Sequence, residues 1–356
     1  MSKYKKALKI LHKGTVVPAI PLVLDENRQF DEVGQRLLTR YYLEAGSGGI
    51  AVAVHTMQFE IRDSKYNLFE TVVKTVINEI GKYEAETGKK IVKVCGLCGE
   101  KDQAVWEAKF AKKLGFDAGL LSPGGLKHLT DEQMLERTRV VAKVLPVIGF
   151  YLQTAVGGRK FTYDFWREFC AIENVVAIKI APFNRYMTLD VVRAAALSPR
   201  VNEIALYTGN DDNIVNDLIT EYEFNENGKI YRKKIVGGLL GHWSVWTNAA
   251  VKLFEKIRAA KKPTAELITL AAQVTDMNAA AFDTANNFHG CISGIHEILR
   301  RQGLMRGIWC LNPSETLSPG QAEELNRVCA AYPYLTDDAF VKEFLLNNTA
   351  KVICRL

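Results

Sequence analysis

One lysine, Lys179, stands in an apolar run, Asn-Val-Val-Ala-Ile-Lys-Ile-Ala-Pro, that is typical of a buried strand. Lysine is rarely buried without a partner, because its ammonium group loses its hydration inside a protein. Burial favours the neutral amine, which is the form that attacks a carbonyl carbon to give a Schiff base. A lysine at the edge of a barrel, reaching solvent or a core carboxylate, is the alternative. Position alone leaves both interpretations open.

Tyr151 ends an earlier apolar run, Val-Ile-Gly-Phe-Tyr-Leu-Gln, and precedes Lys179 by 28 residues. If the two runs form neighbouring strands of a barrel, we expect Tyr151 and Lys179 side by side at one rim. A phenol in that place could carry protons to and from an iminium and a substrate hydroxyl. Taken alone, a tyrosine at such a position is more often a residue of the hydrophobic core than a proton carrier.

Three further segments carry polar groups where strands are expected to end. His55 and Thr56 offer an imidazole, a hydroxyl and backbone N–H groups that can hold a carboxylate, although a buried structural histidine is the alternative. Gly209, in Thr-Gly-Asn-Asp-Asp, allows a turn into a helix that either faces an anion or is simply well capped. Arg159, in Val-Gly-Gly-Arg-Lys, can neutralise a second carboxylate or a phosphate, or be a plain surface arginine.

Short apolar runs that alternate with amphipathic, helix-like segments must position these residues. Several runs are apolar throughout, as are parallel strands that are covered on both faces. Eight such strand–helix units predict a (β/α)8 barrel, the TIM barrel, with a doubly wound open sheet as the alternative. The predicted strands cover residues 15–21, 49–54, 90–97, 118–122, 146–152, 175–181, 203–208 and 238–245.

The strand pattern stops after Pro263. Residues 264–356 favour helices only, with interruptions at Asn312-Pro313 and at Ser318-Pro319-Gly320. We therefore expect a barrel over residues 1–263 and a C-terminal helical extension over residues 264–356.

The composition excludes several classes of protein. The net charge of +6 is spread along the chain without a long basic block, so a nucleic-acid partner is not expected. The N-terminal segment lacks the features of a secretory signal, and no run approaches the roughly 20 apolar residues that cross a bilayer. Seven scattered cysteines indicate reduced thiols in a cytoplasmic protein. Cys95-Gly-Leu-Cys98 is a CxxC motif without the second pair that zinc would need.

The ordered set of motifs resembles the dihydrodipicolinate synthase / N-acetylneuraminate lyase family, over roughly residues 14 to 310. The set comprises Pro18-Ala-Ile-Pro-Leu, the Val-His-Thr turn, Tyr151 and the lysine of Val-Ala-Ile-Lys. The segments Thr-Gly-Asn-Asp-Asp and Gly-Leu-Leu-Gly-His-Trp-Ser-Val are similar to those at the family's seventh and eighth strands. The resemblance implies that Lys179 forms the imine, Tyr151 relays protons, and Thr56 belongs to the turn that binds the carboxylate. It also implies a homo-oligomer, tetramer or dimer, that needs no organic cofactor.

Several positions depart from the family pattern. The strand-two turn reads Val-His-Thr-Met-Gln instead of Gly-Thr-Thr-Gly-Glu or Gly-Ser-Thr-Gly-Glu, and residues 123–125 read Pro-Gly-Gly where the synthases have Pro-Tyr-Tyr. Losing a phenol to glycine opens space, which Met57, Phe59 and Trp243 are candidates to line. We therefore expect a bulkier or more apolar electrophile than aspartate semialdehyde, with His55 supplying a proton transfer.

These observations predict a Schiff-base lyase of the aldolase type. It would form or cleave a C–C bond between a 2-oxo acid, such as pyruvate, and an aldehyde. A sugar-acid dehydratase that uses the same lysine imine is the nearest alternative. A protein that binds a 2-oxo acid without turnover is the alternative from another class.

Overall fold

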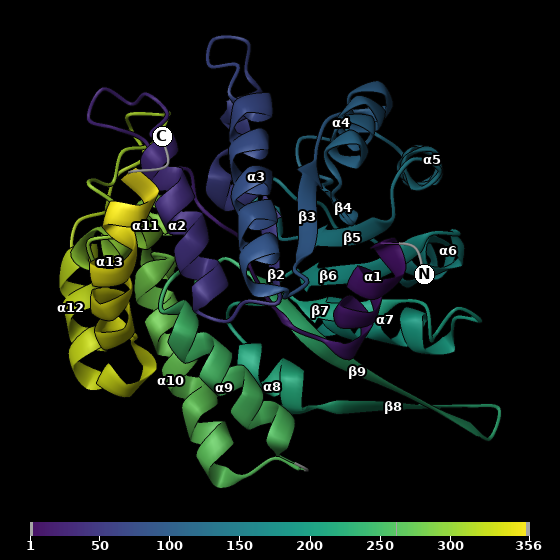
Figure 1. Cartoon of the computed structure of the whole chain (residues 1–356). Coiled ribbons are helices and arrows are strands. Elements are labelled where there is room, and N and C mark those ends of the chain that lie inside the picture. The colour runs from purple at the N-terminus through teal and green to yellow at the C-terminus, as the bar shows by residue number, and fades with distance from the viewer. Residues whose placement is uncertain (1–2, 261, 354–356) are drawn as a thin grey trace. The chain divides into compact units, whose positions relative to one another are not determined.

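The computed structural model describes residues 3–260 and 262–353. In this part of the chain, eight strands are each followed by a helix, which confirms the predicted (β/α)8 barrel class (Figure 1). The C-terminal helices that follow are α10 (Ala265–Ala281), α11 (Cys291–Arg301), α12 (Gln321–Ala331) and α13 (Asp338–Ile353).

The chain divides into two compact units. Unit 1 holds Met1–Thr15, Val92–Leu239 and Ala260–Ile268, and unit 2 holds Val16–Ile91, Leu240–Ala259 and Thr269–Leu356. The domain boundary at residue 263 stays a prediction. Of the seven cysteines, the six within the described residues form no disulfide, and Cys354 lies outside those residues.

Unit 1 is built on a parallel sheet with the strand order β9-β7-β6-β5-β4-β3. Every residue of β3 to β7 is buried, which explains why these strands are nearly continuous apolar runs. The strands are β3 (Val92–Leu97), β4 (Ala118–Leu121), β5 (Val147–Leu152), β6 (Val175–Ala181), β7 (Ala205–Thr208) and β9 (Lys229–Leu240). The helices that follow β3 to β6 pack on the sheet: α4 (Lys101–Leu114), α5 (Asp131–Ala142), α6 (Tyr163–Ala171) and α7 (Arg185–Leu197). The first helix, α1 (Lys3–Lys13), contacts β3 and β6.

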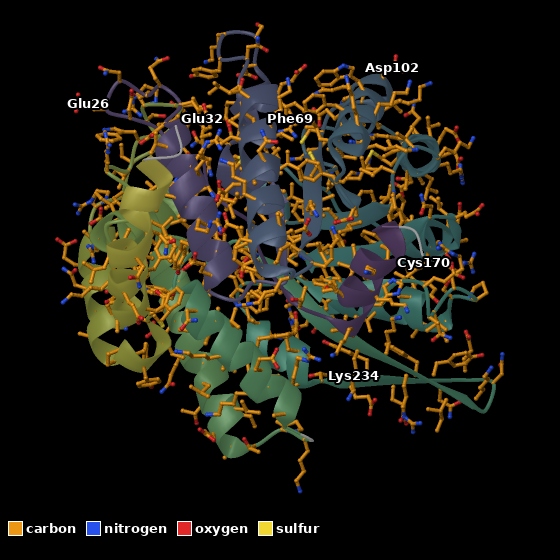
Figure 2. All side chains as sticks on the ribbon, viewed as in Figure 1. Glu26, Glu32, Phe69, Asp102, Cys170 and Lys234 are labelled. Atoms are coloured by element: carbon orange, nitrogen blue, oxygen red, sulfur yellow. The ribbon has the colours of Figure 1, made fainter. Side chains whose placement is uncertain are left out.

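A hairpin interrupts the repeat between α8 (Ile214–Ile219) and the end of β9. Strand β8 (Glu221–Glu226) pairs antiparallel with the first half of β9, and the two extend as a ribbon (Figure 1). Acidic β8 faces basic β9, with ion pairs from Glu223 to Arg232 (2.9 Å) and from Glu221 to Lys234 (3.6 Å). Figure 2 labels Lys234 on this hairpin. The sequence prediction missed this hairpin, because its alternating charged and apolar residues contain no continuous apolar run. It also placed the last strand at residues 238–245, whereas β9 ends at Leu240.

Unit 2 contains the first two barrel strands and most of the C-terminal helices. Strands β1 (Val16–Pro18) and β2 (Gly49–Val52) lie in parallel contact, extended by a bridge between Ala19 and Ala51. The helices of this part of the barrel are α2 (Glu32–Glu44), α3 (Phe69–Thr87) and α9 (Thr247–Ala259). Helix α2 packs between α3 and α13, and buried Arg40 of α2 pairs with Glu79 of α3 at 2.6 Å.

Candidate active site

Lys179 lies in β6, two residues before the carboxyl end of the strand, where barrel enzymes carry their chemistry. Its side chain is 7 % exposed, and Nζ lies 4.4 Å from the centroid of the Phe150 ring. Burial lowers the pKa of Lys179 to about 8, while the negative charge of Asp211 acts in the opposite direction. At pH 7 about a tenth of the lysine would then be the neutral amine. This is the form that adds to a carbonyl group.

The register between β5 and β6 decides which side chains share a face with this lysine. Phe150 pairs with Lys179, and paired residues of neighbouring parallel strands point to the same face. Tyr151, the next residue, points to the other face. The pairing shifts by one residue between Val147 and Ile148, and this shift puts Phe150 in the position expected for the tyrosine. The expectation that Tyr151 and Lys179 lie side by side is therefore wrong.

Tyr151 instead holds the loop that follows β5. Its hydroxyl donates to the carbonyl oxygen of Phe161 (3.3 Å) and accepts from the N–H of the same residue (3.2 Å). Its ring packs against Trp166 of α6, with the ring centroids 5.0 Å apart. Burial raises the pKa of Tyr151. These contacts favour the core-tyrosine interpretation over a proton relay.

Gly209, the first residue after β7, lies directly against Lys179. A Cβ at Gly209 would come within 2.6 Å of Lys179 Cε and 2.8 Å of Ala181 Cβ, closer than side-chain atoms approach one another. The N–H of Gly209 donates to the carbonyl of Ile180 at 2.7 Å. Glycine is therefore needed here so that the lysine side chain can pass over the turn.

A buried carboxylate, Asp217 of α8, fixes the turn that contains Gly209. It accepts hydrogen bonds from Thr208 Oγ1 (2.7 Å), Asn210 Nδ2 (2.9 Å) and Arg185 Nη1 (2.6 Å). The residues on both sides of Gly209 are thus tied to one buried group. This anchoring also sets the position of buried Asp211, whose charge acts on Lys179.

Arg159 is already engaged by the protein itself. Its guanidinium donates to Asp131 Oδ1 (2.7 Å) and to the carbonyl of Leu129, and it lies 5.1 Å from the centroid of the Phe161 ring. It therefore ties the loop after β5 to the start of α5. This arrangement favours a structural role over the predicted binding of a second carboxylate or phosphate.

In unit 2, His55 and Thr56 lie in a short 3-10 helix, His55–Met57, directly after β2. Thr56 is buried, and its hydroxyl donates to the carbonyl of Ala19 at 2.5 Å. His55 is half-buried and meets the ring of Phe59 edge-on, with centroids 5.8 Å apart. Non-glycine residues on both sides of the turn, Ala53 and Gln58, have positive φ values of 58° and 62°. Such strain concentrates at functional sites, which agrees with a role for this turn.

Trp243 is part of the core of unit 2. Its ring packs edge-on against Phe254 of α9 at 6.0 Å, and its carbonyl accepts from Thr247 Oγ1 at 2.7 Å. This packing does not favour the pocket-lining position predicted for it. Among the described residues, no three His, Cys, Asp or Glu side chains gather closely enough to hold a metal ion.

The structure thus brings together Lys179 and Gly209, and separately Tyr151 and Arg159, which both contact Phe161. Sequence reasoning missed Phe150, Asp211 and Asp217. The spacing Asn213-x-x-x-Asp217 was a usable signal for the last of these, because residues four apart share a helix face, and Asn213 Nδ2 does donate to Asp217 at 2.9 Å.

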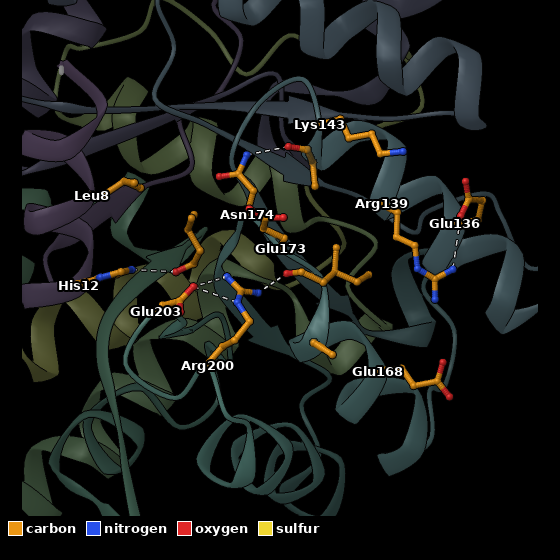
Figure 3. A pocket seen from close by; sticks show the side chains of 14 residues that line it. Leu8, His12, Glu136, Arg139, Lys143, Glu168, Glu173, Asn174, Arg200 and Glu203 are labelled. Carbon is orange, nitrogen blue, oxygen red and sulfur yellow. Dashed lines mark hydrogen bonds and ion pairs between the residues drawn. The ribbon is translucent and has the colours of Figure 1, made fainter.

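A cavity of about 1010 Å³ in unit 1 is lined by residues around the amino end of β6, whereas Lys179 lies near its carboxyl end. Figure 3 shows the side chains that line this cavity. It is lined by Asn174, Val176 and Arg200 among others, and His12 Nε2 lies 3.2 Å from the carbonyl of Val176. Side chains at this amino end of barrel strands usually serve stability. The cavity therefore does not mark the candidate active site.

The sequence matches no family model, and no curated protein matches it. Solved structures do match. Dihydrodipicolinate synthase from Oceanobacillus iheyensis is 19 % identical, with a TM-score of 0.73 over 93 % of this chain and 99 % of that one. N-acetylneuraminate lyase from Fusobacterium nucleatum, complexed with pyruvate, is 16 % identical, with a TM-score of 0.70 over 91 % and 99 %. The likeness is one of fold. It confirms the structural resemblance that the motifs suggested.

The contact between Gly209 and Lys179 predicts a specific defect in Gly209→Ala. The new methyl group would push the lysine side chain aside, at a cost of about 1–3 kcal/mol of stability for overpacking. An imine between pyruvate and Lys179 can be trapped by reduction with borohydride, and the rate of this trapping should fall about tenfold or more. Gly81→Ala is the matched control, because a Cβ there meets nothing within 4 Å; it should leave trapping unchanged. Trapping in Gly209→Ala at the wild-type rate would refute the contact.

The surroundings of Tyr151 predict a loss of stability in Tyr151→Phe. Two buried backbone groups of Phe161 lose their partner, which should cost about 1–3 kcal/mol of unfolding free energy. The trapping rate per folded molecule should hold. Tyr186→Phe, at an exposed tyrosine, is the control and should be neutral. A rate per folded molecule that drops about 10²-fold in Tyr151→Phe, at unchanged stability, would instead restore the proton-relay role.

Proposed function

We propose that this protein is a class I lyase of the aldolase type, in which Lys179 forms an imine with a 2-oxo acid such as pyruvate. The observation that carries the proposal is a lysine buried near the carboxyl end of a barrel strand, with its pKa lowered by burial. The proposal is supported by the similar fold of two solved enzymes, whose family uses this chemistry.

The proposed chemistry needs no organic cofactor. The neutral amine of Lys179 adds to the carbonyl carbon. The oxygen then leaves as water with one proton from the amine and one from a general acid, which gives the iminium. The iminium withdraws electrons from the neighbouring carbon, so that loss of a proton there gives an enamine. The enamine carbon then attacks an aldehyde, or the reverse steps release one. The 2-oxo acid and the aldehyde are thus the proposed partners.

The proton carriers of this reaction differ from those implied by the resemblance. Tyr151 faces away from Lys179, so we assign the proton released by the lysine to Asp211, the carboxylate whose charge acts on it. The roles of His55 as a proton carrier and of the Thr56 turn as a carboxylate site, both in unit 2, stay predictions from the sequence.

The same resemblance leads us to propose the oligomeric state and the location of the protein. We propose a homo-oligomer, tetramer or dimer, that acts in the cytoplasm and has no nucleic-acid partner. None of the helices in the described part of the chain is long and apolar enough to cross a membrane.

Two other functions use the same lysine. A sugar-acid dehydratase would expel water from the imine and release an intact dehydrated acid, whereas the lyase releases an aldehyde and pyruvate. A protein that binds a 2-oxo acid without turnover would form the imine and release no product; the position of Tyr151, away from Lys179, is the observation that favours it. Product identification after incubation with sugar acids separates the three.

The imine can be tested directly with borohydride. Reduction in the presence of pyruvate should inactivate the protein and attach one pyruvyl group to Lys179, found by peptide mass spectrometry. The rate should rise about tenfold per pH unit below pH 8 and level off above it, because the ammonium form does not react and the pKa of Lys179 lies near 8. Lys179→Ala should abolish the label.

Lys233 provides a matched control for the borohydride experiment. Burial lowers its pKa to about 8 as well, but its Nζ is held by the carbonyl oxygens of Val201 and Ile204. Lys233→Met should therefore leave the label unchanged. A label at Lys233, or no label with several 2-oxo acids, rejects the Schiff-base mechanism.

The glycines after β4 predict the preferred electrophile. Gly125 is exposed, and Gly124 is half-buried. A Cβ at Gly124 would lie 3.5 Å from Leu152 Cδ2, so an apolar side chain borders the place where the synthases carry a phenol. Ligands that fill apolar space gain about 0.8 kcal/mol per buried methylene. Values of kcat/KM for aromatic and aliphatic aldehydes should therefore exceed that for aspartate semialdehyde. The prediction is wrong if aspartate semialdehyde is the best substrate of such a panel by tenfold or more.

A further inference from the structure

The CxxC motif, which the proposed lyase chemistry does not use, lies at the carboxyl end of β3. Cys95 is fully buried inside the strand, whereas Cys98 is the first residue after it and is half-buried. No disulfide joins the two, although both lie within the described residues. Figure 2 labels Asp102 in the first turn of α4, close in sequence to the bend that carries Cys98.

The bend around Cys98 is held rigidly. The N–H of Cys98 donates to Glu107 Oε2 at 2.9 Å, and Gln103 Nε2 donates to the other oxygen of that carboxylate at 3.0 Å. Gly99 has a positive φ of 74°, and a Cβ there would lie 2.1 Å from Gln103 Oε1. A side chain at residue 99 is therefore excluded, and the thiol of Cys98 is presented at a fixed place.

Buried Arg137 of α5 contacts this bend. It is 2 % exposed, and its Nε donates to the carbonyl of Gly99 at 2.8 Å, while its Nη2 has no hydrogen-bond partner. Burial lowers the pKa of Arg137 to about 10, and the negative charges of Cys98 and Glu107 oppose that shift, Cys98 most strongly. A buried guanidinium thus has an unused donor at the bend that carries Cys98, and the charge of that thiolate acts on it. Buried donors normally find an acceptor, so this one calls for a ligand or a modification.

The geometry points to Cys98 as a thiol that hydrogen peroxide oxidises to sulfenate, with Arg137 stabilising first the thiolate and then the product. The thiolate is the nucleophilic form of cysteine, and a neighbouring arginine favours it. In the step, Cys98 Sγ attacks one peroxide oxygen, an S–O bond forms, the O–O bond breaks, and the departing hydroxide takes up a proton to leave as water. Sulfur loses two electrons, and peroxide gains them. The new oxygen gives Arg137 Nη2 an acceptor for a charge-assisted hydrogen bond.

The wild-type protein provides the first test. It would be treated with hydrogen peroxide in the presence of dimedone, which traps sulfenic acid, and the loss of free thiol would be measured at each cysteine by peptide mass spectrometry. Cys329 is the internal control, because it is also half-buried, and burial raises its pKa. Cys98 should react at least about tenfold faster than Cys329 and carry the dimedone adduct. Equal or slower loss at Cys98 would overturn the proposal.

The arginine is tested by Arg137→Gln, with Arg139→Gln as the matched control. Arg139 lies on the same helix but is partly exposed and pairs with Glu132 at 2.6 Å. The oxidation rate at Cys98 should fall about tenfold in Arg137→Gln and stay unchanged in Arg139→Gln. An unchanged rate in a folded Arg137→Gln protein overturns the role of the arginine.

If Arg137→Gln does not fold, Glu107→Gln also tests whether nearby charges control the oxidation of Cys98, because it removes a negative charge instead of a positive one. It removes the carboxylate charge that opposes the thiolate, so the oxidation rate at Cys98 should rise. A rate that falls or stays the same contradicts the proposal.

Discussion

The loss of hydration that Lys179 suffers inside unit 1 governs the candidate active site. Apolar neighbours in β6 and the Phe150 ring, 4.4 Å from Nζ, replace water around the amine and lower its pKa to about 8. The opposing charge of Asp211 limits this shift. Gly209 leaves room for the lysine stem, and the buried Asp217 keeps the turn in place. Together these contacts favour the neutral form of the Lys179 amine, which is the form that the proposed chemistry needs.

A one-residue shift in strand pairing separates this site from the one that the motif spacing implies. Because side chains alternate along a strand, a slip between Val147 and Ile148 exchanges the faces of Phe150 and Tyr151. The phenol then binds the backbone of Phe161, and an apolar ring takes its place beside the lysine. In the proposed chemistry, imine formation needs the amine and a proton carrier such as Asp211, and it does not need Tyr151. The same residue types at the same spacing can therefore support a different division of roles.

Much of the fold was predictable, because buried parallel strands are continuous apolar runs that stand out in the sequence. β6 was predicted to the residue, and β3 to β5 and β7 to within two residues at either end. Lys179 was found because a charged residue inside such a run is conspicuous. The β8–β9 hairpin was missed because charged and apolar residues alternate in it, so it contains no continuous apolar run. The predicted position of Tyr151 was wrong because a register shift leaves no trace in the spacing of 28 residues. Asp217 was missed because only the spacing from Asn213 pointed to it, and its hydrogen bonds to Thr208, Asn210 and Arg185 depend on the folded structure.

The most direct test of this account is a crystal structure of the protein soaked with pyruvate. The account predicts continuous electron density between Lys179 Nζ and C2 of the ligand, with the carbonyl oxygen lost as water. The ring of Phe150 should lie on the same face of the sheet as the adduct, and Tyr151 should stay hydrogen-bonded to Phe161. Pyruvate bound away from Lys179, or a Tyr151 hydroxyl in contact with the adduct, would contradict it.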